Sequence, residues 1–134
     1  MDFLPIFMDV RNRNCLIVGG GEVAARKVQM LLRAGAKVQV VSPELGDTMQ
    51  EFNQQGEIEW IEAGFEPAHL QNPVLVYAAT DRQTVNQQVS ELAKEKNIPV
   101  NVVDTPELCN FITPSIIDRS PVVAAISTGG ASPD

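Results

Sequence analysis

The chain has 134 residues, of which 44% are hydrophobic and 20% are charged, so it is long enough for one domain with its own core and is unlike a disordered chain. Lys and Arg number 10 against 17 Asp and Glu, and the net charge of −7 disfavours a nucleic-acid-binding protein, which needs a basic face. No segment is apolar for long enough to cross a membrane, and the first residues, MDFLPIFMDV, lack the basic region of a signal peptide. Together with two distant cysteines outside any C-x-x-C motif, these features predict a cytoplasmic protein that binds neither nucleic acid nor membrane.

Short apolar runs alternate with helical patterns along most of the chain. We predict strands at 15–19, 36–42, 58–62, 73–80 and 98–104, and helices at 22–35, 43–56 and 81–97. The segment 58–62 alternates apolar and charged residues, which is typical of an outer strand, whereas 73–80 is apolar until its last residue, which indicates a central one. Strand–helix–strand repetition at this spacing predicts an α/β fold that is Rossmann-like and doubly wound, with a mostly parallel sheet.

The predicted helices have recognisable ends. The helix 22–35 carries an apolar stripe that includes Val23 and Val28 and ends at Gly35. The helix 43–56 has Pro43 in its first turn, and the helix 81–97 opens with Asp81 and closes with lysines, as the helix dipole favours.

The pattern changes after Asp104, where no further helix is long enough for another crossover. The run PVVAAIS (121–127) predicts one more strand. The last residues predict the start of a helix, with Ser132 as N-cap, Pro133 in the first helical position and Asp134 in the first turn. We therefore expect the sequence to be part of a longer protein, the alternative being that 129–134 is a loose tail.

The segment Gly19–Ala24 matches the pattern G-x-G-x-x-A directly after a strand and at the start of a helix. In dinucleotide-binding folds the first glycine permits a tight turn, the second lets the backbone approach the pyrophosphate, and the small third residue lets helix and strand pack closely. Amide groups at the helix N-terminus then face the phosphates. The predicted phosphate-binding residues are Gly19, Gly20, Gly21, Glu22, Val23 and Ala24, the alternative being a glycine-rich packing turn without a nucleotide.

The acid that commonly ends the second strand and holds the adenosine ribose is absent here. That strand ends in VVSPE, so Glu44 or Ser42, with Pro43 between them, is the candidate for the ribose contact. No Arg or Lys follows the strand to meet a 2′-phosphate, which favours NAD over NADP as the cofactor. Thr80, at the end of the fourth strand, is expected to face the same crevice and to serve as the N-cap of the next helix.

These residues, with several longer strings, resemble the N-terminal domain of siroheme synthase, the bifunctional precorrin-2 dehydrogenase and sirohydrochlorin ferrochelatase. The resemblance covers nearly the whole chain and rests on LPIF, CLIVGGGEVAARK, AATD, VNQQV, NVVD and above all PSIIDRSPVVAAISTGGASP. The last string is the most specific, because no general requirement of a Rossmann fold accounts for it.

The resemblance implies NAD-dependent oxidation of precorrin-2 to sirohydrochlorin, followed by insertion of ferrous iron to give siroheme. It implies that Asp104, the aspartate after NVV, is the catalytic residue in both steps. It also implies a homodimer, with residues 1–113 as the NAD-binding domain and 114–134 as the start of a truncated dimerisation region. A carboxylate base works best in a partly buried setting, and the apolar residues before Asp104 favour one.

The substrate carries many carboxylates, so hydrogen-bond donors are expected around it. The candidate substrate-binding residues, each of which could also be an ordinary loop residue, are Asn101, Asn110, Thr113, Ser115, Arg119, Ser127, Thr128 and the Gly129–Gly130 amides. Arg119 could instead pair with Asp118 or with an acid of a partner chain. His69 is isolated and expected on a surface loop, Cys15 in the core and Cys109 as a plain buried thiol, and the sequence predicts no stable metal site.

Two alternatives remain open at this stage. A non-catalytic NAD-binding regulatory domain, like those of ion transporters, shares the glycine turn but usually has the acid that is missing here, and has no need for the PSIIDRSP string. The second alternative is a dehydrogenase fragment that binds NAD but is inactive because its dimerisation helices are missing.

Overall fold

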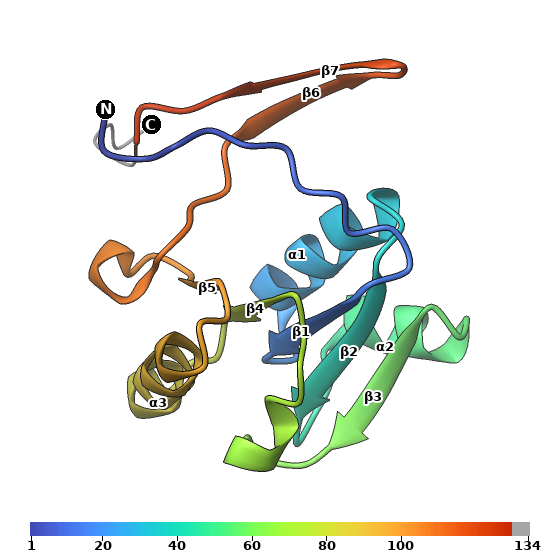
Figure 1. Cartoon of the computed structure of the whole chain (residues 1–134). Coiled ribbons are helices and arrows are strands. Elements are labelled where there is room, and N and C mark those ends of the chain that lie inside the picture. The colour runs from blue at the N-terminus through green and yellow to red at the C-terminus, as the bar shows by residue number, and fades with distance from the viewer. Residues whose placement is uncertain (130–134) are drawn as a thin grey trace.

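The computed structural model describes residues 1–129 of the chain (Figure 1). The predicted helix start at Ser132, with Pro133 and Asp134, and the Gly130 amide lie outside the described residues. Five strands form one parallel sheet in the order β3-β2-β1-β4-β5, which confirms the predicted doubly wound α/β architecture. The strands are β1 (Asn14–Val18), β2 (Lys37–Ser42), β3 (Ile58–Glu62), β4 (Leu75–Ala78) and β5 (Val100–Val102).

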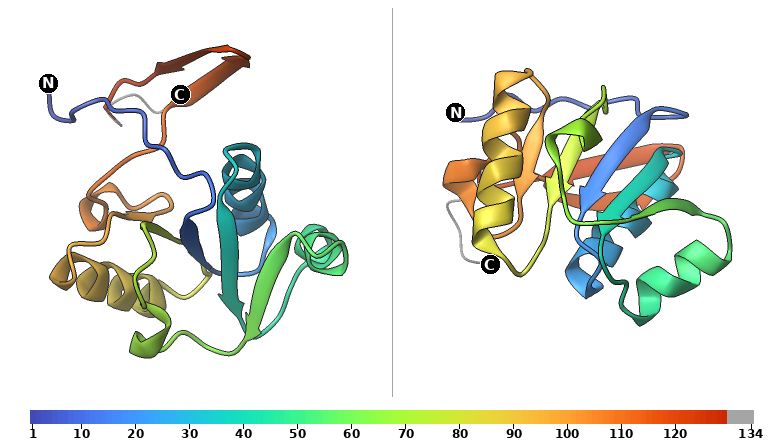
Figure 2. Two further views of the ribbon diagram at one scale, coloured as in Figure 1. Left: turned by 45° about the vertical axis from the view of Figure 1, so that its right-hand side comes forward. Right: turned by 90° about the horizontal axis from the view of Figure 1, so that it is seen from below.

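Helices cover both faces of this sheet (Figures 1 and 2). On one face, α1 (Glu22–Arg33) and α2 (Asp47–Gln54) pack over alternate strand residues such as Cys15 and Ile17. On the other, α3 (Gln83–Glu95) packs over the residues between them, such as Leu16 and Val18. Because side chains alternate along a strand, the nearly unbroken apolar run of β1 supplies both cores, and this explains why its sequence shows no polar alternation.

Three helix details differ from the sequence predictions. The second helix begins only at Asp47 with Gly46 as its N-cap, so Pro43 belongs to the preceding loop. The third begins at Gln83, which leaves Asp81 in the turn before it and no acid in its first turn. Val23 is 38% exposed and does not belong to the buried stripe of α1, which consists of Ala24, Ala25, Val28 and Leu31.

The C-terminal part forms a separate antiparallel hairpin, of which the sequence predicted only the second strand. It consists of β6 (Ser115–Arg119) and β7 (Val122–Ile126), with Ser115 opposite Ile126. The first strand was missed because SIIDR is short and ends in two charged residues. Figures 1 and 2 show the hairpin standing apart from the main sheet, with the N-terminal segment running beside it.

The hairpin and the N-terminal segment expose an unusual number of large apolar side chains. Nine of them are more than 40% exposed, and the two hairpin strands have the composition of buried strands. They are Leu4, Ile6, Phe7, Met8, Ile116, Ile117, Val122, Val123 and Ile126. We call these nine residues the apolar hairpin surface.

Candidate functional site

A cleft of about 770 Å³ opens at the carboxyl ends of the parallel strands. The chain crosses from β3 on one side of β1 to β4 on the other, so the cleft lies at the topological switch point where doubly wound sheets bind ligands. Every strand of the sheet contributes a loop to it. The lining residues include Gly19–Gly21, Ser42–Gly46, Gly64, Phe65, Ala79–Arg82, Val103 and Asp104.

The glycine turn after β1 has the geometry that the sequence motif requires. Gly19 has a φ of 131°, and a Cβ there would lie 2.5 Å from the carbonyl oxygen of Ala79. Gly21 is different, because a Cβ there would meet no atom within 4 Å and would project into open space. Ala24, in the first turn of α1, is fully buried, as the third small residue of the motif should be. The turn therefore leaves free room for a pyrophosphate at the first amides of α1, and the residues present fit a dinucleotide.

The loop between β2 and α2 closes tightly over this turn. The amide of Gly46 donates a 2.8 Å hydrogen bond to the carbonyl oxygen of Gly20, and a Cβ on Gly20 would collide with the carbonyl oxygen of Glu44. The hydroxyl of Ser42 donates to that same Glu44 carbonyl at 2.6 Å. Ser42 is thus used to shape the loop, which leaves the Glu44 side chain as the better of the two predicted ribose contacts.

A second carboxylate, that of Glu22, lies near the β2–α2 loop. Glu22, at the start of α1, accepts a 2.8 Å hydrogen bond from the hydroxyl of Thr48 in α2. This bond ties the two helices that border the cleft on its β2 side. Glu22 and Glu44 both line the cleft, and among the described residues neither an Arg nor a Lys lines this side of it. The arrangement is consistent with the prediction of NAD rather than NADP.

Thr80 lines the cleft as predicted but is not a helix N-cap. Its hydroxyl accepts from the amide of Arg82 at 3.1 Å and bonds with Oδ1 of Asn86 at 2.7 Å. The N-cap of α3 is Arg82, which makes no side-chain capping bond. Thr80 therefore holds the turn before α3. Within the part of the chain that the structure describes, Arg82 is the one basic residue that lines the cleft.

Asp104 lines the cleft across from the glycine turn, at the end of β5. It has a φ of 62°, in the left-handed region that few residues other than Gly, Asn and Asp adopt. Its side chain is exposed, so the partly buried setting expected from the apolar NVV sequence is wrong for this chain. The reason is that the turn lifts Asp104 off the end of the sheet, while Val102 stays in the core.

Three of the predicted substrate-binding residues form internal bonds that hold the chain segment after Cys109. Asn101 donates to the carbonyl oxygen of Phe111 at 3.0 Å, and Oδ1 of Asn110 accepts from the amide of Val100 at 2.7 Å. The hydroxyl of Thr113 lies 2.6 Å from that of Tyr77. None of these three residues lines the cleft among the described residues. Their assignment to the substrate stays a prediction.

The remaining predicted substrate residues lie on or beside the hairpin. Ser115 and Arg119 are exposed on β6, and the hydroxyl of Ser127 accepts from the amide of Gly129 at 3.0 Å. Thr128 follows directly. The carboxylate of Asp118 pairs with Arg33 of α1 at 3.6 Å, whereas Arg119 donates to the backbone carbonyl of Asp118. The ion pair considered for Arg119 and Asp118 is therefore wrong, and the acid ties the hairpin to α1 instead.

The two cysteines differ in their surroundings. Cys15 is fully buried in the core as predicted, and burial raises the pKa of its thiol to about 11. Cys109 is only partly buried, with a pKa that burial also raises, and its sulfur contacts the backbone of the loop that carries Asp104.

His69 lies in a short 3-10 helix, Pro67–His69, where its Nδ1 accepts from the amide of Glu66 at 2.9 Å. Among residues 1–129, no three His, Cys, Asp or Glu side chains gather in a way that could hold a metal ion. Over the same residues, no helix is both long and apolar enough to cross a membrane.

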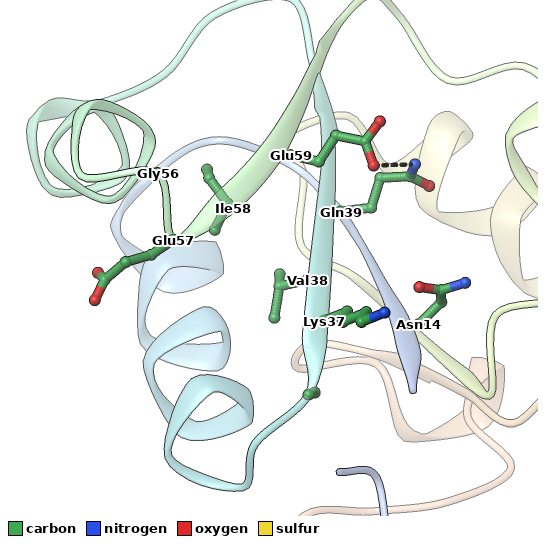
Figure 3. Close-up of a pocket in the computed structure, with 9 residues that line it drawn as sticks. Asn14, Lys37, Val38, Gln39, Gly56, Glu57, Ile58 and Glu59 are labelled. Atoms are coloured by element: carbon green, nitrogen blue, oxygen red, sulfur yellow. Dashed lines mark hydrogen bonds between the residues drawn. The ribbon is translucent and has the colours of Figure 1, made fainter. Parts of the chain in front are cut away.

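A second, smaller hollow of about 370 Å³ lies at the opposite end of the strands, beside the amino ends of β1, β2 and β3 (Figure 3). Gln39 donates to Glu59 across it at 3.0 Å, and Lys37 and Glu57 border it. Parallel sheets bind ligands at the carboxyl ends of their strands, so this hollow is not the functional site.

Sequence reasoning missed several residues of the cleft. Gly46, Phe65, Arg82 and Val103 line it but belong to loops that follow different strands. The available signal for Gly46 was a glycine followed by an acid, Asp47, which is a possible helix start that Pro43 obscured. The others carry no local signal, because only the packing of the loops brings them together.

Comparison with known proteins agrees with this geometry. Residues 6–115 match the family model NAD_binding_7, described as "Putative NAD(P)-binding". The chain belongs to this NAD(P)-binding family. Membership confirms the prediction of NAD as the cofactor, and it agrees with the free space above Gly21.

Relatives with longer chains extend the comparison. The chain is 58% identical to a siroheme synthase of Nitrosospira multiformis and 57% identical to one of Methylobacillus flagellatus, in each case over 99% of its own length. A solved structure named "SirC, precorrin-2 dehydrogenase" is 28% identical and superposes with a TM-score of 0.83 over 98% of this chain and 64% of that one. The resemblance to the N-terminal domain of siroheme synthase is thereby confirmed. The chain spans less than a third of the length of these curated relatives, 29% and 28%.

Proposed function

We propose that this chain is the precorrin-2 dehydrogenase part of a siroheme synthase, which oxidises precorrin-2 to sirohydrochlorin with NAD⁺. The observation that carries the proposal is the position of Asp104, which faces the same switch-point cleft as the open amides beside Gly21. A group that accepts hydride and a carboxylate that accepts a proton are the two requirements of a dehydrogenation. The relatives named siroheme synthase and precorrin-2 dehydrogenase support the choice of substrate.

Each part of the cleft has its own role in this proposal. NAD⁺ supplies the hydride acceptor. The amides from Gly21 onward hold its pyrophosphate. Glu44 of the β2–α2 loop and Glu22 of α1 face its adenosine ribose. Asp104 takes the proton that leaves precorrin-2 with the hydride. The products are sirohydrochlorin, NADH and one proton, which balances the loss of two hydrogens from the substrate.

We further propose that the same protein inserts Fe²⁺ into sirohydrochlorin. Two pyrrole protons must leave as the iron enters, and the exposed carboxylate of Asp104 can accept them and guide the ion in turn. No resident metal is needed for this role, because iron is a substrate here. The support for this second step is the similarity to siroheme synthases.

Homodimerisation belongs to the same proposal. The nine exposed side chains of the apolar hairpin surface support burial against a partner, and a second copy of the chain is the partner that the family resemblance implies. The substrate residues predicted on β6 and after β7 would then lie close to the interface. Sedimentation of the full-length protein tests this part.

The decisive experiment is the absorbance change of precorrin-2 with the full-length protein, with and without NAD⁺. We expect conversion to sirohydrochlorin only when NAD⁺ is present, and a second spectral change when Fe²⁺ is then added. Binding of NAD⁺ without any conversion would favour a regulatory NAD-binding domain. Activity of the full-length protein combined with inactivity of residues 1–134 would identify the chain as an incomplete catalytic unit.

A further inference from the structure

The turn that presents Asp104 to the cleft holds the residue in an unusual backbone conformation. The φ of 62° is tolerated by Asp but requires that the surroundings hold the turn in place. One backbone bond, from the amide of Thr105 to the carbonyl of Val102 at 3.2 Å, closes the turn. The amide of Val103 donates to Ala78, and the hydroxyl of Thr105 donates to the carbonyl of Val103 at 3.4 Å and accepts from Gln83 at 3.2 Å. These bonds are long, whereas a catalytic carboxylate must be placed within a fraction of an ångström.

The sulfur of Cys109 adds hydrogen bonds on both sides of the turn. It accepts a hydrogen bond from the amide of Val102 at 3.1 Å, and its thiol hydrogen faces the carbonyl oxygens of Val102 at 3.2 Å and Thr105 at 3.4 Å. Val102 precedes the turn and Thr105 follows it. One side-chain atom thus bonds to the backbone on both sides of Asp104.

We propose that Cys109 is a positioning residue, whose thiol holds the Val102–Thr105 turn in the shape that directs Asp104 into the cleft. This inference rests on the proposed function, in which Asp104 is the proton acceptor. It assigns no chemistry to the sulfur itself. The motif reading of the sequence treated Cys109 as a plain buried thiol, and the contacts give it a specific task.

The chemistry of a thiol suits this place. The amide of Val102 needs an acceptor, and the carbonyl oxygens of Val102 and Thr105, which already accept one backbone bond each, have a second lone pair for the thiol hydrogen, so a protonated thiol serves as both acceptor and donor. Burial raises the pKa of Cys109, so the sulfur keeps its hydrogen at neutral pH. Serine offers the same donor and acceptor with a shorter reach, whereas alanine offers neither.

A matched control is a residue of α3 that bonds to the same loop. Ser90 of α3 is buried, and its hydroxyl donates to the carbonyl of Leu108 at 2.6 Å. This bond anchors the 3-10 helix Pro106–Leu108 next to Cys109 but does not touch the Asp104 turn. Ser90→Ala therefore removes a comparable loop contact without releasing the carboxylate.

The test compares Cys109→Ala, Cys109→Ser and Ser90→Ala in the full-length protein. It measures kcat for precorrin-2 oxidation, the Kd for NAD⁺ by calorimetry, and the melting temperature. We expect Cys109→Ala to lower kcat by about 10- to 100-fold while the Kd for NAD⁺ changes less than about twofold, because the glycine turn is untouched. Cys109→Ser should recover most of kcat, and Ser90→Ala should keep it within about threefold of the unsubstituted protein even where its melting temperature falls further.

Each other result has a distinct meaning. A kcat for Cys109→Ala within twofold of the unsubstituted protein overturns the inference, and so does an equal loss in Ser90→Ala, or a failure of Cys109→Ser to recover activity. Absence of any NAD-dependent oxidation by the unsubstituted protein overturns the proposed function, and the inference with it. Should Cys109→Ala not fold, methyl methanethiosulfonate replaces it: this reagent converts the thiol of the folded protein to a methyl disulfide and releases methanesulfinate, and a thiol reductant reverses the change. Cys109→Ser is the insensitive control, and full activity of the modified protein overturns the inference.

Discussion

The carbonyl oxygen of Gly20 accepts a 2.8 Å hydrogen bond from the amide of Gly46. This bond joins the glycine turn after β1 to the N-terminus of α2, two segments that border the cleft from different strands. It requires that Gly20 have no side chain, since a Cβ there would meet the carbonyl of Glu44 and would lie 2.6 Å from the hydroxyl of Ser42. The middle glycine of the GGG run therefore serves packing, whereas its neighbour Gly21 leaves the open space that we propose for the cofactor.

The first prediction concerns stability. Gly20→Ala should lower the free energy of unfolding by about 1–3 kcal/mol, because the new methyl group forces apart two packed backbone segments. Gly21→Ala is the matched control and should change it by less than about 0.5 kcal/mol, because its Cβ meets no atom within 4 Å. Urea denaturation of both variants measures the difference. Equal losses in the two variants would contradict this division of roles.

The second prediction concerns the cofactor. Gly21→Asp should raise the Kd for NAD⁺ at least about tenfold, since a carboxylate would occupy the space that the structure leaves for the pyrophosphate. Gly21→Asn has nearly the same size without the charge and separates repulsion from bulk. Calorimetric titration with NAD⁺ measures both variants, whose melting temperatures should stay close to that of the unsubstituted protein. Undiminished binding by Gly21→Asp would remove the phosphate site from this turn.

The third prediction concerns catalysis. Asp104→Asn should lower the rate of precorrin-2 oxidation by about 100-fold or more, because the amide cannot accept the proton. Asn also tolerates the left-handed φ of 62°, so the turn and the binding of NAD⁺ should persist. The absorbance assay gives the rate, and calorimetry gives the Kd. A variant with full turnover would show that another group takes the proton.

The fourth prediction concerns the contact between Tyr77 and Thr113, whose hydroxyl groups lie 2.6 Å apart. Tyr77→Phe should reduce the free energy of unfolding by about 1 kcal/mol. Thr113→Val should have a similar effect, and the double variant should cost less than the sum of the two, since both single changes remove the same bond. Strict additivity in urea denaturation would mean that the bond does not stabilise the fold.

The fifth prediction concerns pH. The pKa of Cys15 rises from 9.0 to about 11 in the folded chain, so the folded state holds its proton more tightly than the unfolded state does. Its contribution to stability is complete below pH 9 and is lost as the pH rises toward 11. Burial raises the pKa of Tyr77 as well, and this acts in the same direction. The unfolding free energy should therefore fall between pH 9 and 11, and less steeply in Cys15→Ala, as urea denaturation at several pH values can measure.

Strand and helix order, the glycine motif and the choice of a doubly wound sheet could all be predicted from the sequence. These features depend on local patterns, such as the apolar run of β1, the small residue Ala24 and the stripe of α1. Such patterns involve residues close together in the chain, so they can be recognised from the sequence alone. The boundaries were less accurate where two start signals competed, as at Pro43 and Gly46. The first hairpin strand was missed because its sequence, SIIDR, is short and ends in two charged residues, and it pairs with the second strand rather than with the main sheet.

What the sequence by itself determined is therefore the scaffold and the place of its cofactor turn. Only the tertiary structure decided which polar side chains face the cleft: Asp104 is lifted into it by a left-handed turn, whereas Asn101 and Thr113 turn to Phe111 and Tyr77. The tertiary structure also brought Arg82 and Gly46 to the cleft and Cys109 to the turn. The physical reason is that a polar group bonds to whichever partner packing places within about 3 Å, and the partners of Thr113 and Gly20 lie 36 and 26 residues away in the chain.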